Sequence, residues 1–164
     1  GYIAKKEMEN VPLLSTWMKR LHCLFLDRND LKQGLKTILT AIEKVKSGIS
    51  ICIFPEGTRT RVGEAITLQR GAANIAVRCN SSLRVVVIHC SERMLDKQSR
   101  WYNVPPKKPI FTVDVRERIN IHDFYDASQH EPALAARQLN RHMQHQLTTG
   151  LQSLSGMKDA SALS

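Results

Sequence analysis

The sequence predicts an α/β fold in which a mixed, partly parallel sheet is flanked by helices. Short apolar runs of strand length alternate with segments whose apolar residues recur at helical spacing. Polar, Gly- or Pro-containing stretches follow these runs, as expected at strand ends. With 164 residues and 42% hydrophobic content, the chain suits one domain, which we expect over residues 1–150, followed by a flexible tail at 151–164.

In the first half of the chain, residues 13–20 predict a short helix and residues 22–26 (HCLFL) a strand. The next helix has one apolar stripe, formed by Leu31, Leu35, Ile38, Leu39, Ile42 and Val45. Gly48 follows this stripe and suits a helix C-cap. ISICIF, residues 49–54, predicts a buried strand that leads into a polar loop.

In the second half, RGAANIAVRC (70–79) predicts an Ala-rich helix and LRVVVIHC (83–90) a second buried strand. A long polar loop over 91–109 precedes IFTVDV (110–115), which alternates like a strand. Glu-Pro then opens a helix over 131–151.

The net charge of +9 comes entirely from residues 1–118. Such a charge suits nucleic acid, an anionic membrane surface or a phosphorylated substrate. An aromatic content of 5% is low for a single-strand nucleic-acid platform, and no run approaches the ~18 apolar residues of a membrane span. The cysteines form no CxxC pair, so we expect buried free thiols at Cys23, Cys52, Cys79 and Cys90.

Polar groups follow two of the predicted strands at their carboxyl ends. Asp27 and Arg28 follow the strand at 22–26, and PEGTRTR follows the strand at 49–54. In sheets with parallel strands, ligands bind at this edge. We therefore expect two neighbouring strand ends to bring Arg28 and Arg59 to a common cleft, with Glu56 beside them.

The residue types in PEGTRTR suit a phosphorylated polyol. Gly57 permits a tight turn, and the amides around Gly57 and Thr58 are suited to an anion-binding nest. Arg59 presents a planar fork to two phosphate oxygens, and Arg61 is placed to assist. Glu56 accepts hydrogen bonds from hydroxyls, which favours a glycerol phosphate over a bare anion.

FPEGTR (54–59) resembles the third signature of the glycerol-phosphate acyltransferase superfamily, most closely that of the 1-acylglycerol-3-phosphate acyltransferases. LFLDR (24–28) is similar to their second signature, and AKKE (4–7) and RGAANIAV (70–77) resemble flanking family segments. The resemblance implies that Arg28, Glu56, Gly57, Thr58 and Arg59 bind the acceptor, with Asp27, Arg61 and Arg70 in support.

The same resemblance implies acyl transfer from acyl-carrier protein or coenzyme A to a lysophosphatidate, giving phosphatidic acid at the cytoplasmic face of the cell membrane. We expect peripheral association without a transmembrane helix in this chain, no bound cofactor, no metal and no nucleic-acid partner. Acyl-carrier protein is a possible protein partner, and Trp17 to Arg20 are candidates for membrane docking.

The family's first signature, H-x-x-x-x-D, carries the general base and precedes the AKKE region. We expect this chain to be a fragment that lacks this N-terminal part, with no catalytic residue of its own and negligible activity alone. His22 and Asp27 reproduce the spacing, but a strand between them would hold the two about 16 Å apart. We therefore reject this pair as the base.

Two alternatives remain open from the sequence. The strand SLRVVVIHC (82–90) lacks the prolines usual in the family's fourth signature, which leaves another lysophospholipid or a specialised lipid as acceptor. The net charge of +9 alone supports a non-catalytic basic module that binds anionic lipid or nucleic acid.

Overall fold

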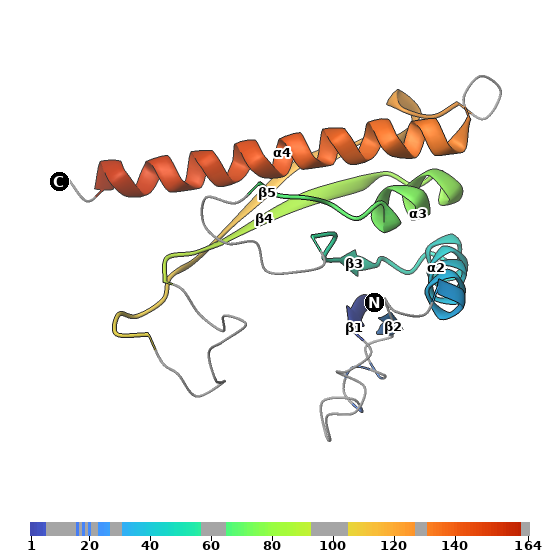
Figure 1. Cartoon of the computed structure of the whole chain (residues 1–164), viewed down its shortest axis with the longest axis horizontal. Helices are drawn as coiled ribbons and strands as arrows, with labels where there is room; N and C mark the ends of the chain where they lie inside the picture. The colour runs from blue at the N-terminus through green and yellow to red at the C-terminus, as the bar shows by residue number, and fades with distance from the viewer. Residues whose placement is uncertain are drawn as a thin grey trace.

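The computed structural model describes residues 1–5, 16, 18, 20, 23–26, 31–56, 65–92, 105–126 and 131–161, with the backbone alone described at residues 4, 5, 25, 26, 31 and 155–161. The elements along the chain are β1 (Tyr2–Lys5), β2 (Leu24–Leu26), α2 (Leu31–Lys46), β3 (Cys52–Ile53), α3 (Gly71–Cys79), β4 (Leu83–Cys90), β5 (Phe111–Ile119), the 3₁₀ helix η2 (Ile121–Asp123) and α4 (Pro132–Ser161). In Figure 1, α4 lies across the top with β4 and β5 beneath it, and the strands β1, β2 and β3 lie lower.

The first sheet is fully parallel and has the strand order β2-β1-β3. Its central strand, β1, is an element that the sequence reasoning did not predict, because Tyr2–Lys5 holds too few apolar residues to show a pattern. Helix α2 packs beside this sheet through a cluster centred on Ala41, Ile42 and Ile75, with Ile3 and Ile53 packed against it. The expected parallel portion of the sheet is therefore present.

Helix α2 ends as its sequence predicts. Gly48 has a φ of +88°, which a glycine adopts without steric cost. Its N–H donates to the Val45 carbonyl, and the Ile49 N–H donates to the Lys44 carbonyl, both at 3.0 Å. These two bonds form a Schellman motif, which satisfies carbonyls that the helix end leaves without partners.

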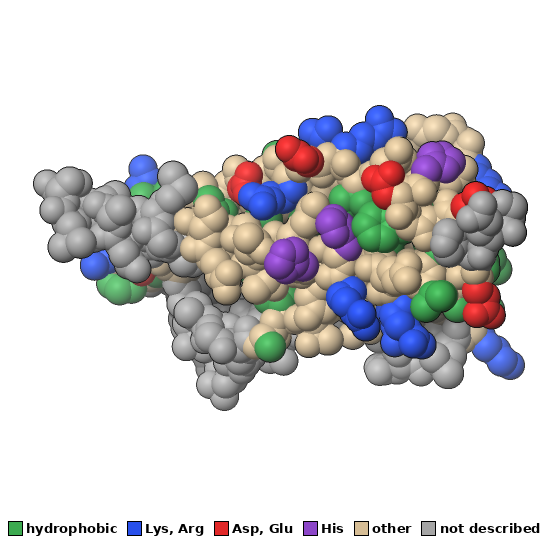
Figure 2. Space-filling view, turned by 90° about the horizontal axis from the view of Figure 1, so that it is seen from above, with side chains coloured by type: hydrophobic (Ala, Val, Ile, Leu, Met, Phe, Trp, Pro, Cys, Tyr) green, Lys and Arg blue, Asp and Glu red, His purple; other side chains and the backbone are tan. Residues whose placement is uncertain are grey.

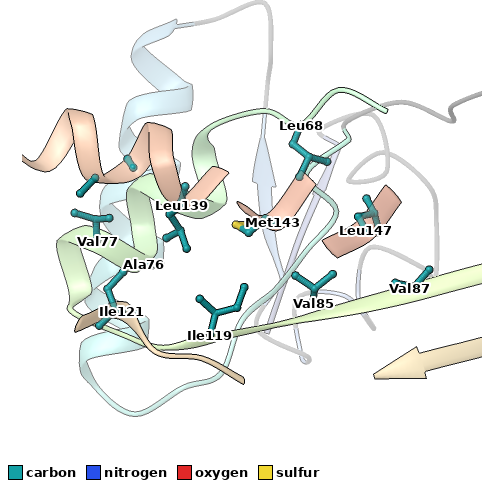
Figure 3. Packing of buried hydrophobic residues seen from close by; sticks show 13 residues of the cluster. Leu68, Ala76, Val77, Val85, Val87, Ile119, Ile121, Leu139, Met143 and Leu147 are labelled. Atoms are coloured by element: carbon teal, nitrogen blue, oxygen red, sulfur yellow. The ribbon is translucent and has the colours of Figure 1, made fainter. Parts of the chain in front are cut away.

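The second sheet is the antiparallel pair β4–β5, and α4 covers one of its faces. The main core lies between them (Figure 3) and includes Leu68, Val77, Val85, Val87, Ile119, Ile121, Leu139, Met143 and Leu147. Helix α3 contacts both α2 and α4, so it joins the helix beside the first sheet to the helix that covers the second. Gly150 permits a close approach here, since a Cβ at this position would lie 2.7 Å from Val87 Cγ2.

Helix α4 continues well beyond the predicted end at residue 151 and reaches Ser161. Leu151 and Leu154 pack against the main core, so the apolar stripe of the helix extends past the predicted limit. The residues that follow contain good helix formers and no proline, which allows the helix to propagate. The predicted helix at 13–20 falls largely outside the described residues.

The predicted burial of two strands was wrong. β3 comprises just Cys52 and Ile53, and Cys52 is exposed. In β4, Val85 and Val87 are buried whereas Arg84, Val86 and Ile88 are exposed. Helix α4 covers one face of β4. The apolar run LRVVVIHC, which we expected to be buried on both faces, is therefore buried on one face.

The cysteines are free thiols, as predicted, but none of them is buried. Cys23, Cys79 and Cys90 are half-buried and Cys52 is exposed. Among the described helices, none is both long enough and apolar enough to traverse a lipid bilayer.

Candidate functional site

The carboxyl ends of three parallel strands meet at one edge of the first sheet. β1 ends at Lys5, which is in register with Leu26, the last residue of β2. β3 runs along the other side of β1, with Ile53 in register with Ile3. The segments that follow β2 and β3 therefore leave the sheet at the same edge, where ligands bind in open α/β sheets.

The two strand ends are not immediate neighbours, which corrects one detail of the sequence prediction. β1 lies between β2 and β3, so the two ends are about 10 Å apart, which is two strand spacings. Lys5 occupies the position between them. The backbone of the central strand therefore separates the end of β2 from the end of β3.

Most of the predicted acceptor-binding residues lie outside the described residues: Asp27, Arg28, Gly57, Thr58, Arg59 and Arg61. Their roles remain predictions from the sequence. The structure does describe Glu56 and Arg70, which flank the loop on its two sides. Glu56 is half-buried in the turn after β3, and Arg70 is exposed at the N-terminus of α3.

A backbone hydrogen bond joins the two ends of this loop. The Gln69 N–H donates to the Pro55 carbonyl at 2.8 Å. Arg70, the next residue, is the N-cap of α3, and its carbonyl accepts from the Asn74 N–H at 2.9 Å. The backbone at the N-terminus of α3 therefore lies near the turn that holds Glu56, and the positive end of a helix dipole favours an anionic ligand.

Helix α4 fixes the chain as it returns from the loop, which the sequence analysis missed. Asn140 Nδ2 donates to the Leu68 carbonyl at 3.2 Å, and Gln144 Nε2 donates to the Ile66 carbonyl at 2.8 Å. Leu68 itself is buried in the main core. The i, i+4 spacing of Asn140 and Gln144 indicates that the two amides lie on one face of a helix. It does not predict their hydrogen-bond partners, which are 72 and 78 residues away in the chain.

Replacing Gln144 with leucine should loosen this return segment without unfolding the protein. A neutral hydrogen bond contributes about 1 kcal/mol, so hydrogen exchange of the Gln69 amide should accelerate by about fivefold. The exposed Gln138, replaced with leucine on the same helix, is the control and should leave that rate unchanged. Equal rates in both variants would contradict the role of Gln144.

Two of the thiols, Cys52 and Cys79, are poorly suited to nucleophilic catalysis. Cys52 is exposed as a residue, but partial desolvation of its thiol raises the pKa, and the nearby N-terminal ammonium lowers it in part. Burial also raises the pKa of Cys79, against a smaller lowering by Lys46. Both thiols therefore stay protonated at neutral pH, and the thiolate is the reactive form.

Within the described ranges, no cluster of three His, Cys, Asp or Glu side chains is placed to hold a metal ion.

Comparison with known proteins identifies the family. The family model described as Acyltransferase matches residues 2–91. The 1-acyl-sn-glycerol-3-phosphate acyltransferase of Bacillus subtilis is 39% identical over 75 residues, which are 46% of this chain and 36% of the relative. The enzyme of the same name from Pseudomonas aeruginosa is 31% identical over 104 residues, 63% of this chain and 40% of the relative.

The fold comparison agrees. The crystal structure of the 1-acyl-sn-glycerophosphate acyltransferase PlsC from Thermotoga maritima matches with a TM-score of 0.63 and 20% identity. The match covers 94% of this chain and 56% of that protein, and it supports the α/β fold. This chain thus spans about half or less of the length of the proteins that it matches. Because the family model covers more than half of its residues, the chain belongs to the acyltransferase family.

Proposed function

We propose that this chain is the acceptor-binding part of an O-acyltransferase that acylates 1-acyl-glycerol-3-phosphate and gives phosphatidic acid. The observation that supports this most directly is the turn at Pro55 and Glu56, which follows β3 at the carboxyl edge of a parallel sheet and whose Pro55 carbonyl accepts from the Gln69 N–H. The relatives that carry the name 1-acyl-sn-glycerol-3-phosphate acyltransferase support the same acceptor.

In the proposed complex, the phosphate of the acceptor binds Arg28 and Arg59, and Arg70 adds positive charge near it. Glu56 accepts a hydrogen bond from a glycerol hydroxyl, which orients the acceptor within the site. The amides around Gly57 and Thr58 donate to the phosphate oxygens, with Arg61 and Asp27 in support. This set of donors and one acceptor distinguishes a glycerol phosphate from an inorganic anion.

The reaction needs a general base that removes the proton from the free hydroxyl. The hydroxyl oxygen then attacks the carbonyl carbon of the acyl thioester, the C–S bond breaks, and the leaving thiolate takes up a proton. The family's H-x-x-x-x-D signature is the proposed source of this base. Residues 24–26 between His22 and Asp27 form β2, which supports our rejection of that pair as the base.

The donor is proposed to be acyl-carrier protein or coenzyme A, and the lipid acceptor places the protein at the cytoplasmic surface of a membrane. A different lysophospholipid or a specialised lipid remains the alternative acceptor, because β4 carries Arg84 and Val87 where the family's fourth signature commonly has proline.

An acceptor competition decides between the two lipid classes. The longest available form of the protein is given an acyl thioester and equal amounts of lysophosphatidate and a second lysophospholipid, and the acylated products are separated. Lysophosphatidate should be consumed at least tenfold faster, since its terminal phosphate matches the predicted arginine pair. Preferential use of the other acceptor would overturn the assignment to lysophosphatidate.

A further inference from the structure

The face of the β4–β5 sheet that α4 leaves uncovered is apolar. Val86 pairs with Val115 and Ile88 pairs with Val113 across the two strands. These residues, with Ile110 and Phe111 at the start of β5, form what we call the outer stripe, and each of them is exposed. Ile110 and Phe111 are the most exposed of the set, at 63% and 60%.

An exposed face of this kind is unusual. One-sided antiparallel sheets normally alternate apolar residues toward the core with polar residues toward water. On the core side this pattern holds, since Val85 and Val87 are buried beneath α4. The outward face of α4 is polar by comparison, and Figure 2 shows charged and histidine side chains spread over it with few apolar ones between them. Contiguous exposed apolar surface marks a site of interaction.

Basic residues lie at both ends of the outer stripe. At one end, Arg84 pairs directly with Arg118 across the strands. At the other end, Lys107 and Lys108 are exposed and are separated from Ile110 by Pro109 alone. The carboxylate on the opposite face of β5, Asp114, is already paired with Arg116 at 3.0 Å.

The pairing of Arg84 with Arg118 points to an anionic partner. Like charges directly opposite each other destabilise a sheet, and neither guanidinium forms an ion pair with another described residue. Glu117 and Glu92 are the nearest acidic residues along the chain, and neither is in register with the arginine pair. An anion between the two side chains would remove the repulsion and restore favourable electrostatics.

We propose that the outer stripe is a membrane-docking surface, which inserts its apolar residues between lipids while the basic residues at its ends bind anionic headgroups. The identity of the anions as membrane lipids rests on the proposed function, which requires a lipid substrate. A surface that combines an apolar stripe with flanking cations binds the membrane interface through burial of its apolar side chains and through attraction of its cations to anionic headgroups. This surface is distinct from the segment Trp17 to Arg20 considered above.

The charges argue against a second copy of the chain as the occupant. Two copies packed face to face along the stripe would place the arginine end against either an arginine end or a lysine end. Both arrangements bring cations together, and neither Glu117 nor Glu92 is in register with the arginine pair. An anionic lipid surface meets no such repulsion.

The test measures sedimentation of the chain with vesicles of zwitterionic lipid that contain increasing amounts of anionic lipid, in the absence of acyl donor and acceptor. The double variant R84Q/R118Q should bind anionic vesicles about 25-fold more weakly, since each basic residue near such a surface raises the affinity by about fivefold. The matched control R137Q/R141Q removes the same charge from exposed sites on α4 and should change binding less than threefold. Equal losses in both variants would overturn the proposal.

A second pair of variants tests how much the apolar residues of the outer stripe contribute to vesicle binding. Ile88→Thr with Val113→Thr should weaken vesicle binding about tenfold, whereas Leu134→Gln, at an exposed site on α4, should not. Hydroxyl-radical footprinting should show protection of Ile110 and Phe111 on adding vesicles. Protection that instead grows with protein concentration in their absence would favour a second copy, and no protection in either case would overturn the proposal. Vesicle binding needs no turnover, so a failure here is distinct from a failure of the acyl-transfer assignment.

Discussion

Replacing Glu56 and Arg59 together with alanine should weaken binding of a short-chain lysophosphatidate by at least a hundredfold. Each side chain is proposed to make a charge-assisted hydrogen bond, and such bonds contribute about 1.5–3 kcal/mol. Two of them together correspond to a loss of at least about 100-fold in affinity. The double change removes one negative and one positive charge, so the net charge of the chain stays the same. Calorimetric titration of both forms measures the difference.

The control for this experiment preserves the same charge balance elsewhere. Glu131→Ala with Arg137→Ala changes two exposed residues near the start of α4 and should leave lysophosphatidate affinity unchanged. Binding of heparin to all three proteins is measured in parallel. If the variant at Glu56 and Arg59 loses heparin and lysophosphatidate affinity in the same proportion, the loop acts as a general basic surface and the acceptor site is wrongly placed.

Leu139→Ala should destabilise the fold by about 3 kcal/mol. Leu139 is fully buried in the main core, where α4 packs against α3 and β4. Its truncation removes apolar contacts and leaves a cavity that the rigid neighbours cannot fully close. Urea unfolding followed by circular dichroism reports the change as a lower midpoint at an unchanged slope.

Leu134→Ala is the matched control because it makes the same chemical change on the same helix. Leu134 is 46% exposed, so its truncation creates no internal cavity and should cost less than about 1 kcal/mol. A similar loss of stability in the two variants would contradict the packing of α4 described above.

Local sequence patterns predicted the elements that carry strong periodicity or clear caps. The apolar stripe beginning at Leu31 and the glycine at position 48 defined α2, and RGAANIAVRC defined α3 to within one residue. These features depend on neighbours within a few residues, which the sequence displays directly. β1 was missed for the converse reason: it is a strand because β2 and β3 pair with it on both sides.

The sequence by itself determined the family resemblance and the residue types of the proposed acceptor loop, because the residues in PEGTR and their order are local properties of the chain. The tertiary structure decided what lies next to that loop: Lys5 between the ends of β2 and β3, and the α4 amides of Asn140 and Gln144 on the returning segment. It also decided that LRVVVIHC is covered on one face alone. Such pairings join residues far apart in the chain, and their positions depend on the packing of whole elements, which no local pattern encodes.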